Sequence, residues 1–143
     1  MDRDTLALLG DCNTGIELAV ANMDHILPSI KDQLLRRKLQ ESIRRHEALH
    51  TQAQDLLLQR GGHIRRPSPL SVQLVRLKAD AHLTLRRDDP TAAELVANSC
   101  DMGVRSLCRS RNRYLGADHE AQFLAAQLID CQEKLSASLR SFL

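Results

Sequence analysis

The residues best suited to chemistry lie in one short stretch, residues 46–50, which reads His-Glu-Ala-Leu-His. On a helix, His46 and His50 are one turn apart and Glu47 is beside them, which is the H-E-x-x-H pattern of zinc peptidases. Zinc needs a further protein ligand, and no downstream residue falls in a recognised companion motif. The residues that could serve are His63, Asp80, His82 and Glu94. Such peptidases also hold substrate along an edge strand, and no segment here suits a strand, so this interpretation ranks third.

The apolar pattern offers a simpler interpretation of the two histidines. His46 and His50 fall on the same helical stripe as Leu39, Ile43 and Leu57, and residues at this spacing form one face of a helix. We therefore expect His46 and His50 to pack in or near a helical core with their hydrogen bonds satisfied. Glu47 would then reach toward a neighbouring arginine or solvent.

The remaining nucleophiles and charges form no recognisable site. The cysteines, which we expect to be free and mostly buried, are scattered singly without a CxxC pair: Cys12, Cys100, Cys108 and Cys131. The net charge is only +2 and one tyrosine and two phenylalanines are the sole aromatics, whereas a nucleic-acid surface is typically strongly basic or rich in stacking residues. We expect no nucleic-acid partner.

Composition predicts one folded helical domain over residues 1–143. Apolar residues make up 43% and charged residues 27% of the chain, aromatics only 2%, and the abundant Leu, Ala, Arg and Gln are strong helix formers. No run is long and apolar enough for a membrane span, and no stretch resembles a secretory leader. A cytoplasmic protein without a membrane partner is expected.

Helical periodicity and helix-breaking residues divide the chain into five helices. Pro28, Gly61-Gly62 and Gly116 mark stops, whereas Asp89-Pro90 and Asp118 mark starts. A narrow stripe of Leu70, Leu74, Leu77, Ala81 and Leu85 predicts a helix that lies against the outside of the others. The expected bundle helices are 4–27, 31–60, 90–115 and 118–142, and the expected crossover helix is 70–87.

Two pattern matches at nearly one offset indicate an internal duplication. Cys12-Asn13-Thr14-Gly15-Ile16 matches Cys100-Asp101-Met102-Gly103-Val104, 88 residues later. Ile43-x-x-His46-Glu47-x-Leu49 matches Ile129-x-x-Gln132-Glu133-x-Leu135, 86 residues later. The repeat halves are therefore about 4–60 and 90–143, and the duplication predicts Cys12 over Cys100 and Glu47 over Glu133. Glycine inside a helix needs a packing reason, so Gly15 and Gly103 are expected at close helix contacts.

A duplicated helical hairpin joined by a long connection implies a four-helix bundle with a crossover. With its paired Cys-Asn/Asp-x-Gly segments and crossover helix, the chain resembles the ferritin-like superfamily, in particular small bacterial ferritin-like proteins with a helix in the crossover. The resemblance covers nearly the whole chain. It implies an internally duplicated, all-α ferritin-like bundle.

The resemblance also implies where a metal would bind. Ferritin-like di-iron sites take a Glu from each of two helices and a Glu-x-x-His from each of the other two, and the first half offers Glu17, Glu47 and His50. The repeat places Arg105 where Glu17 stands in the first half and Ser136 where His50 stands. Because a guanidinium cannot ligate a metal and would repel it, we expect no two-metal centre. At most one iron, manganese or zinc ion would bind, through Glu17, Glu47 and His50, and no cofactor is otherwise expected.

The sequence therefore favours a non-catalytic ferritin-like bundle with degenerate metal ligands and a binding or structural role. The alternative is a metal-binding or di-iron oxidoreductase. A homo-oligomer, most simply a two-fold dimer, is expected because Leu8, Leu34, Leu56 and Leu58 add apolar positions beside the stripes.

Overall fold

The computed structural model describes residues 3–64, 73, 76–80, 83 and 88–143, and these residues confirm an all-helical fold, with no strand among them. The long helices agree with the predicted ones to within a few residues. They are α1 (Arg3–Ile26), α2 (Gln33–Gln59), α4 (Asp89–Arg113) and α5 (His119–Ser138). Two short 3-10 helices, Leu27–Ser29 and Arg140–Phe142, follow α1 and α5, so the last α-helix ends before the predicted residue 142.

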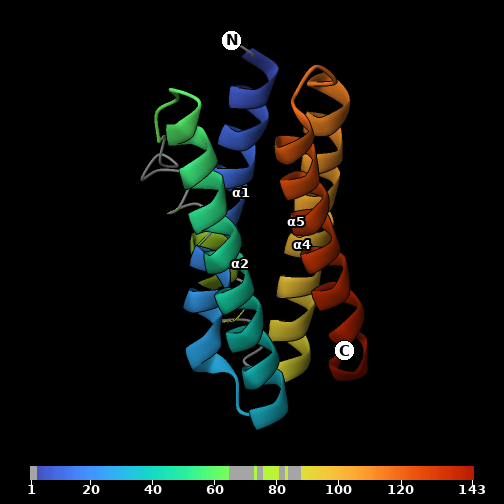
Figure 1. Ribbon diagram of the computed structural model, residues 1–143. Coiled ribbons are helices and arrows are strands. Elements are labelled where there is room, and N and C mark those ends of the chain that lie inside the picture. Colours follow the sequence, from blue (N-terminus) through green and yellow to red (C-terminus); the bar gives the residue numbers. More distant parts are fainter. Residues whose placement is uncertain (1–2, 65–72, 74–75, 81–82, 84–87) are drawn as a thin grey trace.

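The four long helices form a bundle of two antiparallel pairs, α1 with α2 and α4 with α5 (Figure 1). Helix α1 also packs against α4, and α2 against α5. Because α2 and α4 run in the same direction (Figure 1), the chain between them must return along the length of the bundle. This arrangement agrees with the predicted crossover, and the bounds 70–87 stay a prediction because most of these residues lie outside the described ones.

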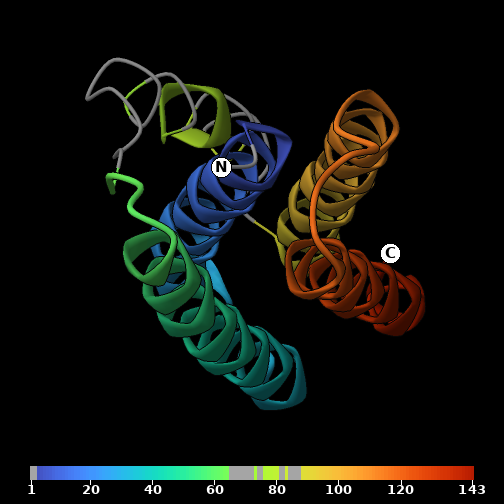
Figure 2. The same cartoon turned by 45° about the horizontal axis from the view of Figure 1, so that its top comes forward.

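The described part of the crossover is helical and lies outside the bundle, beside α1 (Figure 2). Ala79 and Leu83 are buried against the bundle, whereas Leu77 is 57% exposed. The prediction that Leu77 lies on the buried face of this helix is therefore wrong. The other members of the predicted stripe lie outside the described residues. His25 on α1 holds this segment through Asp80, with Nε2 2.6 Å from Oδ1.

The core consists of two apolar clusters stacked along the bundle. The first cluster joins the beginning of α1 to the ends of α2 and α4 and the beginning of α5, and includes Leu9, Leu57 and Leu128. The second cluster lies at the opposite end, where Leu39 and Leu139 are fully buried and the crossover contributes Leu83. Each fully buried leucine contributes roughly 1.5–3 kcal/mol to folding.

Side-chain caps fix the starts of three helices. Asp32, Asp88 and Asp118 each accept a hydrogen bond from the backbone N–H three residues later, at 2.8–2.9 Å. The cap at Asp118 confirms the prediction, but Asp88 rather than Asp89 caps α4. Asp89 instead accepts hydrogen bonds from the backbone N–H groups of Lys31 and Asp32, and so it fastens the start of α4 to the start of α2.

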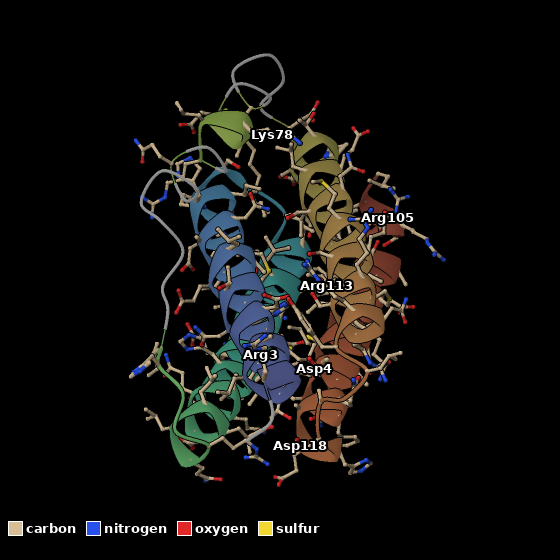
Figure 3. All side chains as sticks on the ribbon, turned by 90° about the horizontal axis from the view of Figure 1, so that it is seen from above. Arg3, Asp4, Lys78, Arg105, Arg113 and Asp118 are labelled. Carbon is tan, nitrogen blue, oxygen red and sulfur yellow. The ribbon has the colours of Figure 1, made fainter. Side chains whose placement is uncertain are left out.

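Helices α2 and α4 end in different ways. At α2, Gly61 has φ +74°, Gly61 N donates to Leu58 O, and Gly62 N donates to Leu57 O. This is a Schellman arrangement, and it confirms the stop predicted at the paired glycines. Helix α4 ends at Arg113 with Tyr114 as its C-cap, before Gly116. The amide of Gly116 instead donates to Asp4, and Figure 3 shows Asp4 at that end of the bundle.

Gly61→Ala is expected to lower the free energy of unfolding by about 1 kcal/mol, because a Cβ is disfavoured at positive φ. The matched control is Gly15→Ala, inside α1, where an added Cβ meets nothing within 4 Å. That variant should gain up to about 1 kcal/mol from helix propensity. Urea denaturation of both variants gives the comparison, and equal midpoints would contradict the cap assignment.

The exposed leucines bear on the predicted homo-oligomer. Leu34 and Leu58 are more than half exposed on α2, whereas Leu8 is fully buried in the core and so no longer supports the argument. Self-association therefore stays a prediction. Light scattering at micromolar concentration should show a mass above the 16.1 kDa of one chain, and a monomer alone would refute it.

Candidate functional site

The structure brings together two of the three predicted metal ligands. His50 Nε2 lies 2.9 Å from Glu17 Oε1, across the contact between α2 and α1, and both side chains are partly buried. Gln54 and Asn13 also approach this pair, at 3.3 Å from His50 Nε2 and 3.4 Å from Glu17 Oε1. Glu47 is exposed. Two of the predicted ligands, Glu17 and His50, thus form a hydrogen bond with each other, without the third.

The second half of the bundle has a different polar pair at the equivalent level. Arg105 is exposed on α4, away from the core (Figure 3). The Arg105 guanidinium would therefore not repel a metal bound in the core, and it no longer argues against a two-metal centre. Ser136 donates a hydrogen bond to Asp101 at 3.0 Å, again at the surface.

The two histidines of the H-E-x-x-H pattern have different surroundings. His50 turns to Glu17, whereas His46 is fully buried and contacts Ser42 and Cys131. Of the further zinc ligands considered, His63 and Glu94 are exposed and Asp80 binds His25, while His82 lies outside the described residues. No three His, Cys, Asp or Glu side chains come together in the part of the chain that the structure describes.

His46 lies at the boundary between the two apolar clusters, since Ile43 belongs to one and Leu49 to the other. Its Nδ1 lies 2.7 Å from the carbonyl oxygen of Ser42, so Nδ1 must carry the proton and Nε2 must present a lone pair. Nε2 is buried without a hydrogen-bond partner among the described residues. The core position was predicted correctly, but the expected satisfaction of its hydrogen bonds was wrong at Nε2.

Burial determines the charge state of His46. It lowers the pKa of the imidazole, and the hydrogen bond to the Ser42 carbonyl opposes this only in part. Burial disfavours the charged form of a basic group. The ring is therefore neutral near pH 7, with a free lone pair inside the protein.

Gln132, which the sequence pattern aligns with His46, occupies the same level of the core. It is 3% exposed, and its Oε1 is a second buried atom without a partner among the described residues. Gln132 and His46 line one small cavity of about 10 Å³, which we call the central cavity. Met23, Asn22, Ser99 and Cys100 also line it. Its volume is about that of one water-sized sphere.

A surface pocket of about 350 Å³ adjoins the central cavity, because Asn22 and Ser99 line both. The pocket is lined by residues of α1, the crossover and α4, among them Lys78, which is labelled in Figure 3 where the crossover approaches α4. Glu94 adds a carboxylate and Met102 an apolar wall.

The cysteines are free, as predicted, and only Cys108 is exposed. Burial, with help from the neighbouring carboxylates Asp11 and Asp101, raises the pKa of the Cys12 and Cys100 thiols to about 12. Burial also raises the pKa of Cys131. The three buried cysteines are therefore neutral thiols near pH 7 and not reactive thiolates.

Comparison of the chain with protein-family models, with curated proteins and with solved structures gives no match. Among the described helices, none is both long enough and apolar enough to cross a membrane.

Sequence reasoning missed the residues that make the central cavity, apart from His46. The repeat did align Gln132 with His46, and this was the available signal that two polar side chains would face each other at one level of the core. Asn22 and Ser99 carried no signal, because their position depends on where the crossover and α4 lie.

Proposed function

We propose that this chain is a non-catalytic helical-bundle protein with a binding role, and that its ligand site is the central cavity at His46. One observation carries the proposal: His46 and Gln132 present buried, unpartnered polar atoms in the middle of an otherwise apolar core. An unsatisfied buried polar atom costs roughly 1–3 kcal/mol. Proteins retain such unfavourable features mainly at functional sites.

The surroundings of the cavity support this role. A neutral imidazole, an amide and a thiol can hold a ligand, but no base is paired with an activated nucleophile in the described residues lining the cavity. The adjoining pocket supplies an entry route past Asn22 and Ser99. These features favour binding over catalysis.

We also propose a ferritin-like, duplicated organisation for the bundle. Equivalent positions of the two halves have the same burial: Cys12 and Cys100 are buried, His46 and Gln132 are buried, and the glutamates that follow the latter two are exposed. The parallel run of α2 and α4 agrees with a crossover bundle.

The alternative function is metal binding through Glu17 and His50, with Glu47 as a third ligand, up to a di-iron oxidoreductase. The 2.9 Å contact between Glu17 and His50 favours it, because one cation could replace the shared proton. Glu47 would have to turn inward from its exposed position.

Native mass spectrometry, with elemental analysis of protein purified without a metal-affinity tag, distinguishes the two sites. We expect a bound species that is lost in His46→Leu and kept in the matched variant His50→Leu. Loss in His50→Leu and Glu17→Ala but not in His46→Leu would establish the alternative. Protein without any bound species would contradict a binding role.

A further inference from the structure

We propose that the central cavity binds one Cu(I) ion through His46 Nε2 and the Cys100 thiolate, with the Met23 thioether as a further ligand. This inference rests on the proposed binding role of the cavity and adds the class of ligand. The cavity is the only place among the described residues where a buried imidazole with an unpartnered nitrogen lines a space together with a cysteine and a methionine.

The orientation of His46 prepares it as a ligand. Its Nδ1–H donates to the Ser42 carbonyl at 2.7 Å, which leaves Nε2 as the atom with the free lone pair. Metal-binding histidines commonly donate their other N–H to a carbonyl or carboxylate in this way, which fixes the ring and raises its basicity.

The kinds of donor select a soft ion. Thiolate and thioether sulfur favour Cu(I), whereas carboxylates and carbonyls favour Mg²⁺, Ca²⁺ and Mn²⁺. No carboxylate lines the central cavity in the described part of the chain. Cu(I) also accepts a low coordination number, which suits a space of about 10 Å³.

Charge balance selects a monovalent ion. When Cu(I) binds, the S–H bond of Cys100 breaks, an S–Cu bond forms and the proton leaves to solvent, so no electron is transferred and the cavity stays neutral. A divalent ion with one thiolate would leave a net positive charge in a buried site, which is strongly disfavoured. The adjoining pocket provides an entry path past Asn22 and Ser99.

The test is anaerobic titration of the metal-free protein with Cu(I), in competition with a colorimetric Cu(I) chelator. We expect one Cu(I) per chain. In His46→Gln and in Cys100→Ala, the affinity for Cu(I) should fall by more than the roughly 10–100-fold that loss of an outer hydrogen-bond partner of a ligand causes. The isosteric Met23→Leu should weaken binding by about tenfold with the fold kept.

Two cysteine variants are matched controls. Cys108→Ala removes the exposed thiol and Cys131→Ala removes a buried thiol on the Nδ1 side of His46, and both should bind Cu(I) as the wild type does. Circular dichroism establishes that each variant is folded. Met23→Leu keeps the proposal testable if Cys100→Ala does not fold.

Three outcomes would overturn the proposal: binding unchanged in Cys100→Ala and Met23→Leu, binding lost in Cys108→Ala, or Zn²⁺ bound as tightly as Cu(I). A different species held at His46 in native mass spectrometry would refute copper and leave the binding role standing. No species at His46 would refute both.

Discussion

Gly103→Ala is expected to destabilise the protein by about 1–3 kcal/mol relative to Gly15→Ala, although the two glycines have matching positions in the sequence pattern. A Cβ at Gly103 would lie 2.3 Å from Oε1 of Gln132 and 3.1 Å from its Cδ. Because Gln132 is only 3% exposed, its amide cannot swing into water and must be displaced within the core. At Gly15 an added Cβ meets nothing within 4 Å.

Urea denaturation at one pH measures the stability of both glycine variants. The Gly103 substitution can also be made in a protein that lacks the Gln132 side chain, which tests whether Gln132 causes the destabilisation. In a Gln132→Ala protein the clash is absent, so Gly103→Ala should there be stabilising by up to about 1 kcal/mol, the gain in helix propensity. If Gly103→Ala has the same effect with and without the Gln132 side chain, Gln132 is not the obstacle.

The second large effect is a loss of stability in mild acid that depends on His46. Burial lowers the pKa of His46 in the folded protein below its ordinary value of 6.5. The unfolded chain therefore binds a proton that the folded protein does not, and stability falls as the pH drops below about 6.5. The contribution of the neutral His46 ring to the free energy of unfolding is complete above that pH. It declines with falling pH until the pKa of His46 in the folded protein is reached.

For one such group, the slope of the free energy of unfolding against pH approaches but does not exceed about 1.4 kcal/mol per pH unit. The shift of the His46 pKa has burial as its main cause, opposed by the hydrogen bond to the Ser42 carbonyl. The free energy of unfolding of metal-free protein should be measured between pH 7.5 and 5, beside His46→Leu and the exposed control His119→Gln. His46→Leu should flatten the profile and His119→Gln should not. Parallel profiles for wild type and His46→Leu would refute the burial argument.

Much of the helical framework could be predicted from local signals, because caps and stops act over a few residues. The Gly61-Gly62 stop and the Asp118 cap are examples. The cap of α4 was misplaced by one residue since Asp88 and Asp89 are chemically equal in the sequence. Only the tertiary contact of Asp89 with the start of α2 separates their roles.

The site was harder to predict, because it depends on contacts between helices that are distant in sequence. Gly15 and Gly103 share one local pattern, and the difference between them arises from the side chain opposite. Likewise, the spacing of Glu47 and His50 fits a metal ligand pair, yet the stripe through His46 and Leu49 turns Glu47 to solvent. Periodicity placed His46 in the core, but its unpartnered Nε2 depends on residues from α1, α4 and α5.

The proposed duplication would account for a site formed from two copies of one helix pair. Equivalent positions on α2 and α5 point to the same level of the core, and there one carries an imidazole and the other an amide. Two polar side chains in that place leave atoms that neither can satisfy alone.

The most direct test of a central site retained for binding is the stability of a protein in which its polar groups are replaced by apolar ones of similar size. The double variant His46→Leu/Gln132→Met should be compared with wild type and with Leu128→Ala by urea denaturation of ligand-free protein at pH 7.5. We predict that the double variant is at least as stable as wild type, since two unsatisfied buried atoms are removed, while it no longer holds the species found at the central cavity. Leu128→Ala should lose about 2–5 kcal/mol. If the double variant is destabilised to the same degree as Leu128→Ala, the polar layer serves folding, and the proposed binding site is contradicted.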